Sequence, residues 1–379
     1  MIYLDNAATT QTPFEVMRIL SGYVSESYAN PGSIHQMGRD AEAAITKARR
    51  TLAKTINADA GQIIFTSCAT EANNMVLLGL EKHLKKQKKK HIIVSSVEHP
   101  SVMNPAKELE RRGFEVTYLP VNQYGQIDMR DLYNTIRDDT GLVSVMCVNN
   151  EIGTFYDPEL IGSICHKKGV LFHTDCVQAY GLVPLDVKKQ HIDFLTVSGH
   201  KIYAPKGVGF LFAKKRELLT PLVYGGGQES GSRSGTENVP GIVGLAAAAS
   251  MVVDARGATR EANRRLQAAI IRGFEAELGD TFKINGIPEN TLRILNVRFS
   301  GVDGESLVLL LSKRGVMVSA GSACSSHSVE PSHVLKAIGL TDEEAKSSIR
   351  ISLSYFTTMA EVKKAVDIII DCVKTLRGE

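Results

Sequence analysis

Lysine, aspartate and histidine side chains stand at the ends of predicted β-strands in this sequence. Asp175, His99 and Lys201 each end or closely follow a short β-rich run. A lysine can form a Schiff base with an aldehyde, an aspartate can keep a pyridine nitrogen protonated, and an imidazole can stack over an aromatic ring. This combination is typical of a site for pyridoxal 5′-phosphate (PLP).

A candidate phosphate site precedes these residues. Thr70 follows the predicted strand 62–67 and opens a helix, where free backbone N–H groups and the helix dipole favour a phosphate. Taken alone, Thr70 could be only an N-cap and Asp175 only a turn or ion-pair residue. Neither a G-x-G-x-x-G after the first strand nor a Walker A motif occurs, which disfavours a dinucleotide. Other polar residues also follow predicted strands, and their accumulation on one rim favours a ligand site: Asn149, Asn150, Glu151, Gln178, Ser198 and His200.

Strand and helix patterns alternate between residues 60 and 215. Nearly continuous apolar strands separated by helices predict a mostly parallel, seven-stranded-type sheet that helices sandwich on both faces. Ligands of such open sheets bind beyond the carboxyl ends of the strands, so the polar residues should meet at one edge. The predicted strands are 62–67, 91–96, 115–121, 142–150, 170–175, 194–200 and 207–215, and the predicted helices include 70–86, 128–139 and 157–169.

The pattern changes after about residue 240, where a long helical region precedes a mixture of strands and helices. A length of 379 residues also favours two domains over one. We predict an α/β fold with a large PLP-binding domain at 16–250. Residues 1–15 and 251–379 are expected to form a smaller α+β domain.

The charge balance gives no reason to expect nucleic acid or a membrane as a partner. There are 44 basic and 41 acidic residues, which leave a net charge of +3. The lysine-rich stretch 82–90 is better explained as a solvated surface. The apolar stretch 242–253 is too short to span a bilayer, and the N-terminus has no signal-peptide pattern, so a cytoplasmic protein is expected.

Six cysteines occur at positions 68, 147, 165, 176, 324 and 372, and none forms a C-x-x-C pair. A structural zinc site is therefore not expected, and no metal is predicted. Cys324 lies in SAGSACSS, a segment rich in glycine and serine that is typical of an exposed loop. A buried apolar role is the ordinary alternative for a cysteine.

Several strings of the sequence resemble one family of enzymes. They are YLDNAATT, TSCATEANN, SVEHPSV, NNEIGT, HTDCVQAYG, SGHKIYAPKGVGFL, RSGTENVP and SAGSACSS. In this order they are similar to the NifS/IscS-type cysteine desulfurases, which are fold-type I PLP enzymes of aminotransferase class V. The similarity extends from residue 3 to about residue 358.

The resemblance implies a role for each matching residue of the cofactor site. Lys201 would hold PLP covalently and move protons, Asp175 would pair with the pyridine nitrogen, and His99 would stack on the ring. Gln178 would hydrogen-bond the ring hydroxyl. The phosphate would be held by Ala69, Thr70, Ser198 and His200, with Thr236 reaching in from the second subunit of a homodimer.

The resemblance also implies the substrate and the reaction. Arg350 would bind the carboxylate of L-cysteine, and Asn150 would contact both cofactor and substrate. Cys324 would attack the substrate sulfur as a thiolate, giving L-alanine and a persulfide. A sulfur-acceptor protein, either an iron–sulfur scaffold or a tRNA-thiolating enzyme, would then take the sulfur.

Two positions depart from the family pattern, and other functions stay open. Cys68 and Ser354 stand where glycine is usual; we expect Cys68 to be a neutral filler, because it would face the phosphate end of PLP. A selenocysteine lyase or another class V activity is the alternative enzyme. A sulfur-transfer scaffold with little activity is the alternative of another class, which an intact Lys201, Asp175 and Cys324 disfavour.

Overall fold

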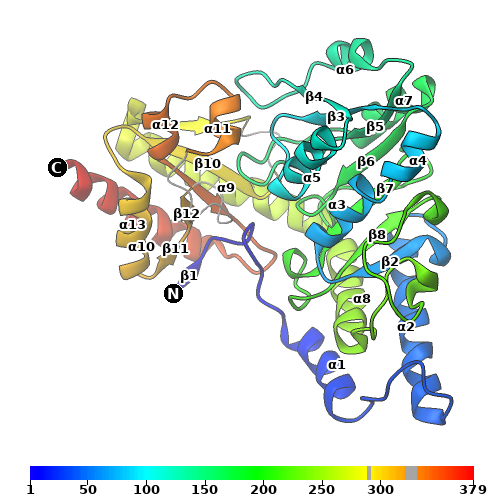
Figure 1. The fold of residues 1–379 in the computed structure, drawn as a ribbon. Helices are drawn as coiled ribbons and strands as arrows, with labels where there is room; N and C mark the ends of the chain where they lie inside the picture. Colours follow the sequence, from blue (N-terminus) through cyan, green and yellow to red (C-terminus); the bar gives the residue numbers. More distant parts are fainter. Residues whose placement is uncertain (288–291, 321–330) are drawn as a thin grey trace.

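The computed structural model describes residues 1–287, 292–320 and 331–379. It is an α/β structure with two sheet-containing parts, and Figure 1 shows the larger part on the right and the smaller part on the left. Cys324 lies outside the described residues, so its predicted role is not addressed by the geometry.

A seven-stranded sheet forms the centre of the larger part, as the sequence predicts. Its spatial order is β2-β8-β7-β6-β5-β3-β4, and β8 runs antiparallel to both neighbours while the other pairs are parallel. Most strands are buried along their whole length, which explains their continuous apolar sequences. The strands are β2 (Ile63–Thr66), β3 (His91–Ser95), β4 (Glu115–Leu119), β5 (Thr140–Ser144), β6 (Leu171–Asp175), β7 (Phe194–Ser198) and β8 (Gly209–Ala213).

Helices cover both faces of this sheet, so the predicted fold class is confirmed. One face packs against α3 (Ala69–Leu77), α4 (Glu81–Lys86) and α5 (Pro100–Arg111). The other face packs against α2 (Gln36–Thr55), α6 (Met129–Thr135), α7 (Pro158–Lys168) and α8 (Val239–Asp254). Helix α1 (Phe14–Ser25) lies against α8 at the lower edge of Figure 1.

Two predicted helices differ from the structure. The predicted helix 70–86 is two helices, because the carbonyl of Gly79 accepts a hydrogen bond from the backbone N–H of Thr220 (2.9 Å). A Cβ at Gly79 would lie 2.1 Å from the carbonyl oxygen of Met75, so only glycine fits this break. The predicted helix 128–139 ends at Thr135, because Ile136 is extended and the backbone N–H of Arg137 bonds the side chain of Thr140 (2.8 Å).

The smaller part has its own antiparallel sheet and its own apolar core. The sheet order is β12 (Ser319–Ala320), β13 (Ser348–Ser352), β10 (Ile294–Phe299) and β9 (Phe282–Asn285). The helices α9 (Arg256–Leu278), α10 (Gly304–Lys313) and α13 (Met359–Arg377) pack on this core, and α11 (His333–Ala337) and α12 (Asp342–Lys346) lie nearby.

The first residues of the chain join the smaller part. Strand β1 (Ile2–Tyr3) pairs in parallel with β11 (Val316–Met317), and Asp5 forms a bridge with Ser352 of β13. These contacts are consistent with the predicted domain boundaries, which stay a prediction. The chain returns from the larger part through α8 and α9.

Within the described ranges, no single helix is long and apolar enough to cross a membrane. In these ranges, one pair of helical segments, α8 and the segment Arg256–Thr281 that follows it, is long and apolar enough when taken together, but the two are bent by 68°. Helix α8 contributes many residues to the core of the larger part.

Candidate active site

A cavity of about 190 Å³ lies at the carboxyl ends of the parallel strands. Residues from the larger part, the smaller part and the N-terminal segment all line it. Thr236 is exposed and is not among the lining residues. The predicted residues that the structure brings together around the cavity are Ala69, Thr70, His99, Asn150, Asp175, Gln178, Ser198, His200, Lys201 and Arg350.

Lys201 enters the cavity from a 3₁₀ turn (Gly199–Lys201) directly after β7. Its Nζ donates hydrogen bonds to the carbonyl oxygens of Ala7 (2.5 Å) and Ala8 (2.7 Å). Thr10 links the N-terminal segment to the turn that carries Lys201, because its hydroxyl donates a hydrogen bond to the carbonyl oxygen of His200 (2.8 Å). The N-terminal segment therefore positions the amine, a contribution that the sequence pattern did not indicate.

Asp175 is the last residue of β6, and its side chain is held from two directions. Oδ1 accepts a hydrogen bond from the backbone N–H of Val177 (2.9 Å), and Oδ2 accepts one from Nδ2 of Asn73 (2.8 Å). A carboxylate fixed in this way at a cavity wall is suited to pair with a protonated ring nitrogen. Asn73 is fully buried and was missed from the sequence.

His99 is the N-cap of α5, and it is held in its orientation by this role. Its Nδ1 accepts a hydrogen bond from the backbone N–H of Ser101 (3.1 Å) and lies 2.8 Å from the hydroxyl of the same residue. Burial lowers the pKa of His99, Lys201 and His333 lower it further, and Asp175 opposes this shift. The imidazole is therefore neutral near pH 7.

Gln178 is held between the N-terminal segment and a buried arginine. Its Nε2 donates to the carbonyl of Ala7 (3.0 Å), and its Oε1 accepts from Nη2 of Arg293 (2.5 Å). Arg293 also donates to the carbonyl of Lys201 (3.2 Å), and burial lowers the pKa of its guanidinium. Because Arg293 fixes the amide oxygen, the NH₂ group of Gln178 is the part that can serve the cavity. No sequence pattern indicates a role for Arg293, which stands alone before an apolar strand.

The N-terminus of α3 forms a further part of the cavity wall. Cys68 is the N-cap, and Ala69 and Thr70 begin the helix, whose first N–H groups have no intrahelical partner. His200 lines the same cavity, and its Nδ1 lies 3.2 Å from the hydroxyl of Thr9. Burial, with the charges of Lys201, Lys206 and Arg293, lowers the pKa of His200 to about 4. A neutral imidazole can donate one hydrogen bond to an anion.

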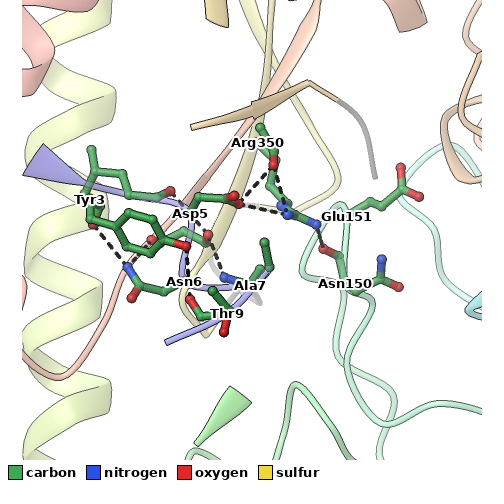
Figure 2. Close-up of polar contacts among 12 residues, drawn as sticks. Tyr3, Asp5, Asn6, Ala7, Thr9, Asn150, Glu151 and Arg350 are labelled. Carbon is green, nitrogen blue, oxygen red and sulfur yellow. Dashed lines mark hydrogen bonds and ion pairs between the residues drawn. The ribbon is translucent and has the colours of Figure 1, made fainter. Parts of the chain in front are cut away.

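Arg350 projects from β13 and is almost completely buried. Figure 2 shows its guanidinium between Asp5 and Asn150. Nη2 forms an ion pair with Oδ1 of Asp5 (3.0 Å), and Nη1 donates to the carbonyl oxygen of Asn150 (2.9 Å). Among the described residues, neither Nε of Arg350 nor Oδ1 of Asn150 has a hydrogen-bond partner, although both are buried. Unpaired buried polar atoms in a cavity wall indicate that a ligand satisfies them.

Two buried carboxyl groups lie behind this wall. Oε2 of Glu151 accepts a hydrogen bond from the hydroxyl of Ser332 (2.5 Å), and Nε2 of His333 lies 2.9 Å from the carbonyl oxygen of Glu98. Burial raises the pKa of Glu98 to about 8 and also raises the pKa of Glu151. The start of α11 is thus attached to the segments that carry His99 and Asn150.

The donor set of the cavity fits PLP. An amine (Lys201) and a carboxylate (Asp175) line the same cavity as a helix N-terminus, and Asn150, whose buried Oδ1 has no partner among the described residues, also lines it. In the described part of the chain, no cluster of histidine, cysteine, aspartate and glutamate could hold a metal ion. The arrangement can therefore bind a phosphorylated pyridine aldehyde and hold its reactive carbon near Lys201.

We predict that Arg293→Met weakens PLP binding about 5- to 30-fold, because the amide of Gln178 loses the partner that orients it. Equilibrium dialysis of PLP measures this change. Arg298→Met is the control, because Arg298 lies in the strand β10 that directly follows Arg293 and pairs with Glu344, which is not among the cavity-lining residues. Unchanged PLP affinity in a folded Arg293→Met variant would show that Gln178 is oriented without Arg293.

Comparisons with known proteins agree with this site. The aminotransferase class-V family profile matches residues 2–365. The cysteine desulfurase IscS of Methanosarcina thermophila is 43% identical over 381 residues, which cover 100% of this chain and 93% of the relative. A solved NifS-like protein superposes with a TM-score of 0.92 at 36% identity and covers 99% of both chains. SspA in complex with cysteine superposes with a TM-score of 0.82 at 37% identity, covering 94% of this chain and 100% of that chain. The chain therefore belongs to the aminotransferase class-V family, within its PLP-dependent cysteine desulfurases.

Proposed function

We propose that this protein converts L-cysteine to L-alanine and passes the sulfur to an acceptor protein. The observation that supports this most strongly is the meeting of Lys201, Asp175 and Arg350 around one cavity. An amine, a ring-nitrogen partner and a carboxylate-binding group are the three groups that PLP chemistry on an amino acid requires. The cysteine-bound structure of SspA supports the same substrate.

PLP, when bound, supplies an aldehyde that captures the substrate amine and a ring that withdraws electrons from the substrate. The side chains of the protein perform the other tasks. Lys201 holds the cofactor in the resting enzyme and moves a proton at the substrate Cα. Asp175 would keep the ring nitrogen protonated, and the neutral ring of His99 would stack on the cofactor without adding a positive charge.

Arg350 binds the substrate carboxylate in this proposal. Both terminal nitrogens of its guanidinium already have partners, so the unpaired Nε is the donor that a carboxylate oxygen would satisfy. The Asp5 partner keeps the guanidinium in place before substrate arrives, because a buried arginine without a counter-charge is strongly destabilising.

Cys324 carries the sulfur in this proposal. Its thiolate attacks the substrate sulfur, so an S–S bond forms and the C–S bond breaks. The carbon keeps the electron pair and takes a proton, which yields alanine, and the enzyme keeps a persulfide. The reaction thus converts cysteine and an enzyme thiol into alanine and an enzyme persulfide without an added oxidant. The acceptor class, iron–sulfur scaffold or tRNA-thiolating enzyme, and the cytoplasmic location stay predictions.

A homodimer would complete the site. Thr236 is exposed, and its segment is anchored by the ion pair of Arg233 with Glu71 (2.8 Å) and by the buried Glu229, which pairs with Arg49 (2.6 Å). The nearby α1 packs on α8 and exposes large apolar side chains, which supports an interface there. These side chains belong to Phe14, Met17 and Val24, followed along the chain by Tyr28 and Ile34.

We predict that Cys324→Ser retains PLP but forms no persulfide, whereas Cys68→Gly retains both PLP and most of the activity. Cys68 lines the cavity beside Ala69 at the N-terminus of α3, which would hold the phosphate, so it would face away from the carbon that carries the substrate sulfur. Mass spectrometry after addition of cysteine without reductant places the added sulfur atom. Finding that sulfur on Cys68, or undiminished in Cys324→Ser, would contradict this assignment.

We predict a dimer in sedimentation velocity and a mixed-dimer rescue of activity. If Thr236 serves the neighbouring site, a Thr236→Ala subunit paired with a Lys201→Ala subunit has one intact site. Mixed dimers purified with two tags should therefore approach half of the wild-type activity, well above either parent. A competent monomer at assay concentration would contradict the dimer, and mixed dimers no more active than their parents would contradict the shared site.

A further inference from the structure

Two buried polar side chains connect Asp175 to His99. Asn73 of α3 is completely buried, and its Nδ2 lies 2.8 Å from Oδ2 of Asp175 and 2.8 Å from the hydroxyl oxygen of Ser101. The hydroxyl of Ser101 lies in turn 2.8 Å from Nδ1 of His99. Neither Asn73 nor Ser101 has a role in the reaction as described so far.

The direction of each hydrogen bond follows from its neighbours. An ionised carboxylate only accepts, so the NH₂ group of Asn73 faces Asp175 and also donates to Ser101. Among the described residues, Oδ1 of Asn73 has no partner although it is buried. The side chain therefore leaves its own acceptor unpaired while both of its donors serve Asp175 and Ser101. This arrangement fits a positioning role better than a purely structural one.

The hydroxyl of Ser101 accepts from Asn73, so its hydrogen is directed to Nδ1 of His99. The backbone N–H of Ser101 donates to the same nitrogen (3.1 Å), and a backbone N–H cannot reverse its direction. With two donors directed at it, Nδ1 has no place for a proton of its own. The ring hydrogen of His99 is therefore on Nε2.

We propose that Asn73 is a positioning residue that holds Asp175 and, through the hydroxyl of Ser101, keeps the imidazole of His99 in its neutral Nε2–H form. The proposal deepens the proposed function and rests on it only for the identity of PLP as the ligand. It explains why a histidine can stack on a cationic cofactor ring. A second positive charge there would be repelled by the ring and by the nearby Lys201 and His333, while Asp175 is the anion among the described residues that acts on His99.

Three variants separate the effect of Asn73 on Asp175 from its effect on His99. Asn73→Leu removes both donors at a similar volume, so PLP binding should weaken about 5- to 30-fold as Asp175 loses a hydrogen bond. It also leaves the Ser101 hydroxyl free to accept a hydrogen bond from a protonated Nδ1, so that only the backbone N–H of Ser101 still opposes protonation there and His99 should titrate about one pH unit higher. Ser101→Ala should raise the pH at which His99 titrates but leave PLP affinity unchanged. Asn74→Ala is the control, because Asn74 is the next residue on α3 and, among the described residues, its side chain donates to the carbonyl of Thr70 rather than to Asp175 or Ser101.

Two measurements read these effects without enzyme turnover. The ¹⁵N resonances of histidine in the cofactor-free protein report the tautomer and titration of His99, identified by its loss in His99→Gln. Equilibrium dialysis gives the PLP dissociation constant. If Asn73→Leu does not fold, Asn73→Ser replaces it, because a serine hydroxyl is too short to reach both partners.

The proposal predicts changes in both measurements for Asn73→Leu, in the titration alone for Ser101→Ala, and in neither for Asn74→Ala. A His99 that titrates identically in all variants would overturn the connection, even if Asn73→Leu binds PLP weakly. Unchanged PLP affinity in Asn73→Leu would overturn the role at Asp175. Failure of the desulfurase proposal would appear instead as normal PLP binding and titration without alanine formation.

Discussion

The buried ion pair between Arg350 and Asp5 joins the parts of the molecule that form the active site. Arg350 belongs to the small sheet, Asp5 to the N-terminal segment, and the same guanidinium bonds the carbonyl of Asn150 from the larger part. A buried charge requires such a partner, so the N-terminal segment must lie here. The carbonyl oxygen of Ala7 then accepts hydrogen bonds from Gln178 and Lys201, and the carbonyl oxygen of Ala8 accepts one from Lys201.

The charged residues of the cavity differ in what they would bind. Asp175 and Lys201 stand where a cofactor ring and its aldehyde would bind, and Arg350 stands where a substrate carboxylate would bind. The two histidines beside them are neutral, because burial and neighbouring cations lower both pKa values. The positive charge of the site is thus carried by Arg350, which would bind the substrate carboxylate, and by Lys201, which would carry the cofactor. The two histidines do not add to it.

The sequence predicted the large sheet and most of the cavity residues, because both depend on local patterns. Continuous apolar strands indicate a covered parallel sheet, and a polar residue such as Asp175 at a strand end must reach its edge. Asn73, Arg293 and Asp5 were not predicted, because their roles depend on contacts between segments far apart in the chain. The break at Gly79 was missed for the same reason, since it depends on a backbone contact from Thr220.

Covalent labelling can identify the lysine that carries PLP. Borohydride reduction makes a Schiff-base link between PLP and a lysine permanent, and digestion with mass spectrometry then identifies the labelled peptide. We expect the label on Lys201, whose Nζ is held in the cavity, and the loss of both the label and all alanine formation in Lys201→Ala. Label on Lys206, which is exposed and is not among the cavity-lining residues, or alanine formation by Lys201→Ala would show that Lys201 is not the cofactor lysine.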